Sequence, residues 1–126
     1  MSYELSFRKP IAVPDDDIYF NDCCYGGDVV SQRLLPTIRE RYGAVRANQE
    51  DWGWFVWFDD RSASLAVDIF CDDRENGRYR IHLTSRRRKW FFLNSVVDVP
   101  ELEDLKTLVM KLFDGWADGP CHSEHF

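Results

Sequence analysis

The sequence predicts an α+β domain with two layers, in which two helices cover one face of an antiparallel sheet. Three β-favouring stretches between residues 52 and 84 predict a meander. Two stretches with apolar residues at helical spacing, 28–42 and 98–116, predict the helices. A further strand is expected before the first helix. The expected order is therefore strand, helix, three or four strands, helix, and the sheet has four or five strands.

The expected strands share a pattern in which apolar side chains point to one face of the sheet. Aromatic residues, which favour strands, fill the first stretch of the meander, and the next two stretches alternate apolar with polar residues. Turn residues separate the stretches at 59–62 and 72–77. The predicted strands are 3–7, 52–58, 65–71 and 79–83, with 90–93 and 96–97 as candidates for one more.

The first helix is expected to begin after Asp28 as its N-cap and to stop at Gly43. Pro36 lacks a backbone N–H, so we expect a kink or a break near Arg33. The stripe that would face the sheet consists of Val30, Leu34, Ile38 and Tyr42.

The second helix is expected to begin near Pro100, with Asp98 as its cap, and to end before Gly119. Acidic residues at 101, 103 and 104 suit the positive end of the helix dipole. Its apolar face consists of Leu102, Leu105, Leu108, Val109, Leu112, Phe113 and Trp116.

Composition predicts one domain at residues 1–120 and a mobile C-terminal tail at 121–126. The chain has 126 residues, of which 44% are hydrophobic and 15% aromatic, enough for one packed core. The first nine residues do not resemble a signal peptide, and no apolar stretch is long enough to cross a membrane. The four cysteines are too irregularly spaced for a secreted disulfide framework. We therefore expect a cytoplasmic protein that does not enter a membrane.

Charge is unevenly distributed along the chain, whose net charge is −6. Residues 74–89 carry 7 basic and 1 acidic side chains, whereas the segments before and after them are acidic. An acidic protein repels phosphate backbones and attracts basic partners. The charge therefore favours a protein partner with a basic surface over nucleic acid.

The outer face of the predicted sheet is the candidate binding site. Matching side-chain parity across the meander places Asp68 opposite His82 and Gly53 beside Asp68. Aromatic and arginine side chains are typical anchors of protein interfaces. The expected partner-binding residues are Phe55, Trp57, Asp68, Arg80, His82 and Arg86. Alternatively, the loop after the first strand or a second copy of the chain covers this face, so a homodimer is a further expectation.

The leading hypothesis is a non-enzymatic module that binds a basic protein, as inhibitors, immunity-type proteins and chaperones do. Nothing in the sequence identifies a cofactor, a catalytic residue or a metal ligand with the spacing that such sites require.

Three alternatives stay open. A carboxylate such as Asp68 could orient His82 as a general base in a small enzyme. The tail residues Cys121, His122 and His125 could bind a metal, although their spacing matches no standard zinc motif. The segment 86–89, three arginines and a lysine followed by aromatic residues, could bind single-stranded nucleic acid.

Overall fold

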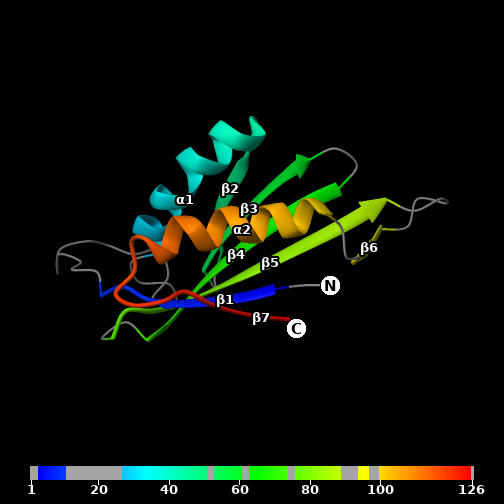
Figure 1. The fold of residues 1–126 in the computed structure, drawn as a ribbon. Coiled ribbons are helices and arrows are strands. Elements are labelled where there is room, and N and C mark those ends of the chain that lie inside the picture. The colour runs from blue at the N-terminus through cyan, green and yellow to red at the C-terminus, as the bar shows by residue number, and fades with distance from the viewer. Residues whose placement is uncertain are drawn as a thin grey trace.

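The computed structural model describes residues 3–10, 27–50, 53–60, 63–73, 76–88, 94–96 and 100–125. These form seven strands and two helices (Figure 1). In chain order they are β1 (Tyr3–Arg8), α1 (Gly27–Tyr42), β2 (Arg46–Glu50), β3 (Gly53–Asp60), β4 (Ala63–Asp73), β5 (Arg78–Arg88), β6 (Asn94–Val96), α2 (Pro100–Asp114) and β7 (His122–His125).

The strands form one antiparallel sheet in the spatial order β2-β3-β4-β5-β1-β7, and β6 pairs with the end of β5. Successive hairpins join β2 to β5, because neighbouring strands in this meander follow one another along the chain. The first strand, β1, adds to the far side of β5, and the last strand, β7, pairs with β1. The predicted α+β class and element order are confirmed.

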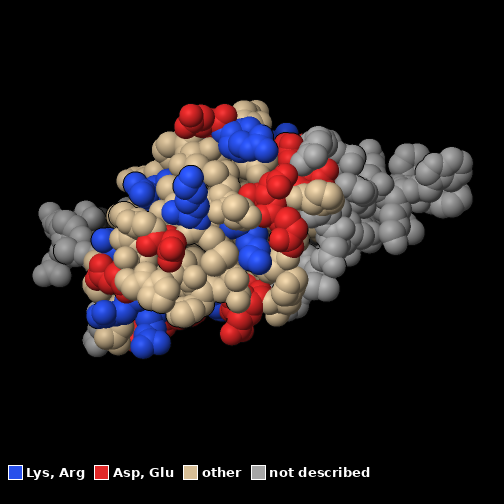
Figure 2. All heavy atoms as spheres, viewed as in Figure 1, with Lys and Arg blue, Asp and Glu red and all other residues tan. Residues whose placement is uncertain are grey.

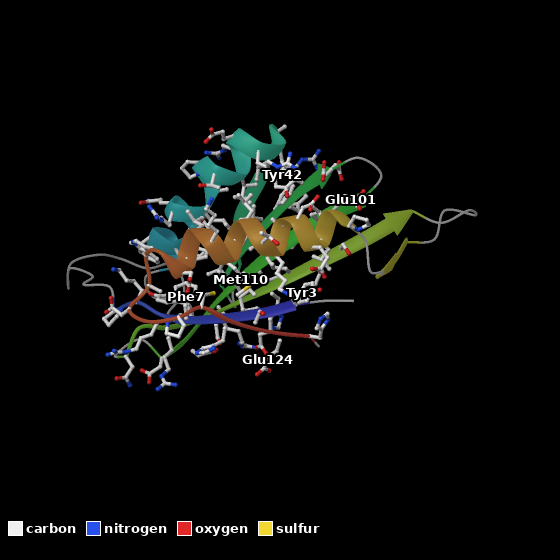
Figure 3. The ribbon with its side chains drawn as sticks, in the orientation of Figure 1. Tyr3, Phe7, Tyr42, Glu101, Met110 and Glu124 are labelled. Atoms are coloured by element: carbon white, nitrogen blue, oxygen red, sulfur yellow. The ribbon has the colours of Figure 1, made fainter. Side chains whose placement is uncertain are left out.

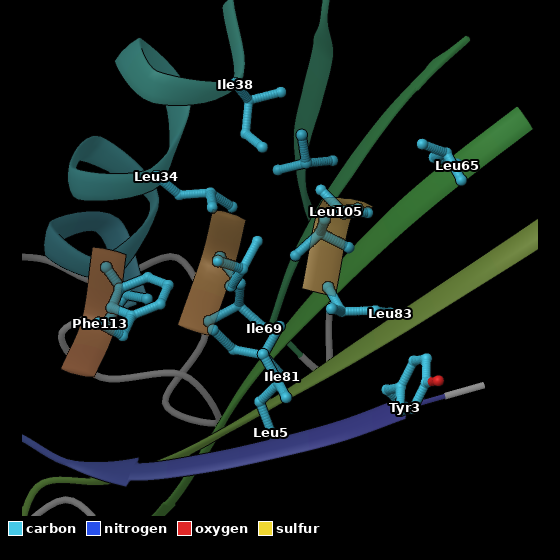
Figure 4. Packing of buried hydrophobic residues seen from close by; sticks show 14 of the residues in the cluster. Tyr3, Leu5, Leu34, Ile38, Leu65, Ile69, Ile81, Leu83, Leu105 and Phe113 are labelled. Atoms are coloured by element: carbon cyan, nitrogen blue, oxygen red, sulfur yellow. The ribbon is translucent and has the colours of Figure 1, made fainter. Parts of the chain in front are cut away.

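Both helices pack on the same face of the sheet (Figure 1). Helix α1 lies over β3 and β4, and α2 lies over β1, β4 and β5. Their apolar stripes meet the inward side chains of the strands in one core (Figure 4). Fully buried members include Leu5, Leu34, Ile38, Leu65, Ile69, Ile81, Leu83, Leu105 and Phe113.

Helix α1 runs without a break through Pro36, so the expected split near Arg33 is not found. Pro36 is exposed, which places the missing hydrogen bond on the solvent side of the helix. The helix begins at Gly27, so Asp28 lies inside its first turn. It ends as predicted at Gly43, where a φ of +86° lets the Gly43 N–H donate to the Arg39 carbonyl at 2.9 Å.

Helix α2 starts at Pro100 as predicted and ends at Asp114, earlier than expected. The N–H groups of Trp116 and Ala117 both donate to the Phe113 carbonyl, which closes the last turn. The predicted cap, Asp98, lies outside the described residues.

Two edge strands were not predicted. Strand β2 is polar except for Ala47 and pairs only with β3 among the described strands. Strand β7 comprises residues that we expected in a mobile tail, and it pairs with β1 from Tyr3 to Ser6. The buried Cys121 precedes it, so the boundary predicted at residue 120 does not match the sheet, whose last strand ends at His125.

The predicted pairing of β4 with β5 is confirmed, and that of β3 with β4 is shifted by two residues. Asp68 lies opposite His82, and Phe70 opposite Arg80. Phe55, rather than Gly53, lies opposite Asp68, because β3 extends to Asp60 and β4 already begins at Ala63. A shift of two residues preserves side-chain parity, so every side chain keeps its predicted face.

We expect Gly77→Ala to lower the free energy of unfolding by about 2–3 kcal/mol, because backbone strain and a steric clash add. Gly77 has a φ of +66°, and a Cβ there would lie 2.5 Å from the carbonyl carbon and oxygen of Lys9. Gly43 is the matched control, since its φ is +86° but a Cβ would meet nothing within 4 Å. Gly43→Ala is expected to cost only about 1 kcal/mol. Urea unfolding measures both, and equal losses would contradict the close approach of Lys9 to Gly77.

Candidate functional site

The candidate site is the outer face of the sheet, which we define as the face opposite α1 and α2. Alternation along β1 illustrates the division of side chains: Tyr3 and Phe7 are buried, whereas Glu4 is half-buried and points the other way. Figure 3 shows Tyr3 and Phe7 directed from β1 toward α2, and Glu124 of β7 directed away from it. Both described helices leave the outer face uncovered.

A row of residues, all polar except Phe55, crosses the outer face from one edge strand to the other. His82 is its centre, because Asp68 lies opposite it on β4 and Glu4 lies opposite it on β1. The imidazole Nε2 is 3.4 Å from Glu4 Oε1. From β2 to β7 the row consists of Asn48, Phe55, Asp68, His82, Glu4 and Glu124.

Arg80 lies beside this row and contacts two of its members, His82 and Glu4. Its guanidinium lies 3.2 Å from Asp72 Oδ2 and 3.4 Å from Glu4 Oε1, and a second nitrogen is 3.4 Å from His82 Nε2. The guanidinium carbon also lies 4.6 Å from the centre of the Phe70 ring. Contacts of this kind are weak at an exposed surface but fix the orientation of the arginine fork.

An aromatic pair occupies the other half of the outer face. The rings of Phe55 and Trp57 stack with centroids 4.9 Å apart and an interplanar angle of 19°. Both side chains stay partly exposed. Together the two partly exposed rings form an apolar area on the outer face, and apolar areas of this kind are characteristic of interaction sites.

Beside the pair lies a hollow of about 290 Å³, which we call the Ala66 hollow. Ala66 forms its floor, because its side chain is short and its neighbours across the sheet, Trp57 and Thr84, are longer. Asp68 lies two residues along the same strand and lines one end. The other lining residues are Phe55, Ser64 and Leu65.

The predicted binding residues Phe55, Trp57, Asp68, Arg80 and His82 all contribute to this face. The backbone of Arg86 lies opposite Ser64, and its side chain is outside the described atoms. Sequence reasoning missed Glu4, since nothing in the chain indicated that β1 pairs with β5 beside His82. It also left Ala66 out, because a small side chain indicates a hollow only when the longer side chains beside it on the neighbouring strands are known.

The enzyme alternative requires a carboxylate that orients His82, and the structure supplies two candidates, Asp68 and Glu4. The thiol of Cys71 is no partner for this pair, because Cys71 lies in register with Tyr79 on the helix-covered face. Catalysis at His82 therefore stays a hypothesis without an identified nucleophile.

The metal alternative requires Cys121, His122 and His125 to converge on one point. In β7, His122 and His125 lie three residues apart and so point to opposite faces. The His125 ring packs 4.3 Å from Tyr3. Burial, with a smaller contribution from Asp114, raises the pKa of the Cys121 thiol to about 11, which disfavours the thiolate that metals bind. Within the described part of the chain, no three such ligands gather into a metal site.

The nucleic-acid alternative depends on residues 86–89. The backbone of 86–88 forms the end of β5, while the side chains of this segment and the aromatic residues after it lie outside the described atoms. On the helix-covered side of the molecule, acidic and basic side chains are interspersed (Figure 2).

Comparison with known proteins gives no relative: no family model, no curated protein and no solved structure matches the chain. Among the helices that the structure describes, none is both long and apolar enough to cross a membrane. The function must therefore be argued from the outer face.

Proposed function

We propose that this protein is a non-enzymatic interaction module, cytoplasmic in location, that binds a basic protein through the outer face of its sheet. The Ala66 hollow supports this function, because it joins a stacked Phe55–Trp57 pair and the carboxylate of Asp68 in one depression. Inhibitors, immunity-type proteins and chaperones are the classes of function that such a module would serve.

The chemistry of the hollow favours a lysine or arginine side chain of the partner. The aliphatic stem of such a side chain would pack on the Ala66 methyl and the Trp57 ring, and its cationic end would reach Asp68. The net charge of −6 would attract a basic partner to this surface and increase the rate of encounter.

A titration with N-acetyl-arginine amide tests this proposal. We expect the amide NMR signals of Ala66, Asp68 and Trp57 and the methyl signal of Ala66 to shift. N-acetyl-citrulline amide should bind about tenfold more weakly because it lacks the charge. Asp68→Asn should remove the preference for arginine. The control is Glu103→Gln, which alters an exposed carboxylate on α2 on the other face of the sheet and should keep the preference.

Two results would contradict the proposal. Equal binding of arginine and citrulline would show that Asp68 does not select a cation. A stable dimer in native mass spectrometry, with the Trp57 ring protected from solvent, would show that a second copy of the chain covers the face instead.

A further inference from the structure

A second hollow lies near the other edge of the outer face, where β5, β1 and β7 run side by side. Its volume is about 330 Å³, and we call it the Ser6 hollow. Ser6 lies directly opposite Arg80 on β5 and opposite His122 on β7. Arg8 follows two residues along β1, so the serine hydroxyl lies among basic side chains.

Cross-strand pairing also places Arg8 directly opposite Arg78 on this face. Two like charges in such a position repel each other and destabilise the sheet. Both arginines are exposed, and the Arg8 Nε–H donates to the Asn76 carbonyl at 3.0 Å. Among the residues that the structure describes, this is the one hydrogen bond of the Arg8 side chain, and no described carboxylate pairs with its charge.

Two carboxylates line the hollow, and each already has a cation of its own. Asp72 accepts from Arg80 at 3.2 and 3.3 Å. Asp118 lies 3.9 Å from the Lys9 ammonium. Within the described residues, by contrast, the side chains of Arg78 and His122 make no hydrogen bond or ion pair. No described carboxylate therefore pairs with the two guanidinium groups and the imidazole that lie around Ser6.

We propose that the Ser6 hollow binds a phosphate group, either as inorganic phosphate or as a phosphate monoester. A phosphate dianion would balance the two charges of Arg8 and Arg78 and remove their repulsion. The planar arginine fork donates two parallel hydrogen bonds to phosphate oxygens, and Ser6 and His122 supply further donors. The site lies apart from the Ala66 hollow, so it does not depend on the proposed basic partner.

Thermal unfolding in phosphate and in chloride at equal ionic strength tests the proposal. With phosphate at about twenty times its dissociation constant, we expect the wild-type melting temperature to rise by about 4–8 °C. Arg78→Gln should abolish this rise and, in chloride, should leave the melting temperature unchanged or higher, because it removes the repulsion with Arg8. A merely structural arginine would lower the melting temperature in chloride.

Two further variants separate the site from general effects of phosphate on proteins. Ser6→Leu keeps every charge but fills the hollow, so it should also abolish the rise. Arg39→Gln changes an exposed arginine on α1, and this control should keep the full rise. A rise that persists unchanged in Arg78→Gln and Ser6→Leu would overturn the proposal.

Calorimetry with two probes identifies the source of the phosphate. Binding of a phosphoserine peptide at least tenfold tighter than inorganic phosphate, and lost in Arg78→Gln, supports a phosphorylated protein as the ligand. Equal binding of both probes, also lost in Arg78→Gln, supports a small phosphate compound. Failure of both probes to bind wild type would overturn the proposal, while the arginine titration at Asp68 would be unaffected.

Discussion

Phe113→Ala is expected to lower the free energy of unfolding by about 3–5 kcal/mol, the usual range when a buried aromatic ring is removed. Phe113 has an exposed fraction of 0% and lies between α2 and the sheet. Its ring stacks on Phe7 with centroids 4.7 Å apart and an angle of 11°, and Trp116 packs against both rings. Since small domains have only about 5–15 kcal/mol of stability, this change should remove a large share of it and clearly lower the urea concentration at the midpoint of unfolding.

Leu112→Ala is the matched control, because Leu112 precedes Phe113 on α2 but is only half-buried. We expect it to lose about 1–2 kcal/mol, as fewer contacts disappear. Urea unfolding followed by tryptophan fluorescence measures both variants. If Phe113→Ala lost no more than Leu112→Ala, the packing of α2 on β1 would be different from that described.

The sequence predicted α2 and the stripe of α1 because burial repeats with the period of a helix. Val30, Leu34 and Ile38 are spaced by four residues, and all three are fully buried. The same reasoning found β4 and β5, whose inward residues alternate with outward ones. Where one side of an element is buried, its sequence therefore carries the signal of its structure.

Edge strands carry a weaker signal, which explains why β2 and β7 were missed. Strand β2 reads Arg-Ala-Asn-Gln-Glu. It pairs with β3 through its backbone, and its described side chains, those of residues 46–48, are exposed. Strand β7 is short and polar, with His122, Glu124 and His125 all exposed. Polar edges of this kind protect sheets from unwanted pairing, and they resemble loops in a single sequence.

Part of the candidate site was predictable from the alternation of residues along its strands, and part depended on strand order. Parity along the meander assigned Asp68 and His82 to one face, and a register error of two residues at β3 did not alter that assignment. Glu4 could not be placed, because the strand order puts β1 beside β5, far from it in sequence. The alternation of residues along a strand predicts which face of the sheet each side chain occupies. The long-range pairing of strands decides which of those side chains become neighbours.

Trp57→Ala is expected to weaken binding of the arginine probe by about 30-fold or more, because large aromatic anchors typically contribute at least 2 kcal/mol to an interface. The variant would lose both the wall of the Ala66 hollow and the ring stacked on Phe55. Its free energy of unfolding should fall by less than about 1.5 kcal/mol, since the side chain is partly exposed on the outer face.

Trp54→Ala is the matched control on the same strand. Trp54 is also half-buried, but it packs against the core on the helix-covered face. We therefore expect the opposite pattern, with a larger loss of stability and unchanged affinity for the probe. If Trp57→Ala unfolded the protein while Trp54→Ala did not, our assignment of the outer and the helix-covered face would be reversed. The outer face would then be the core side of the sheet, and the proposed binding function would be wrong.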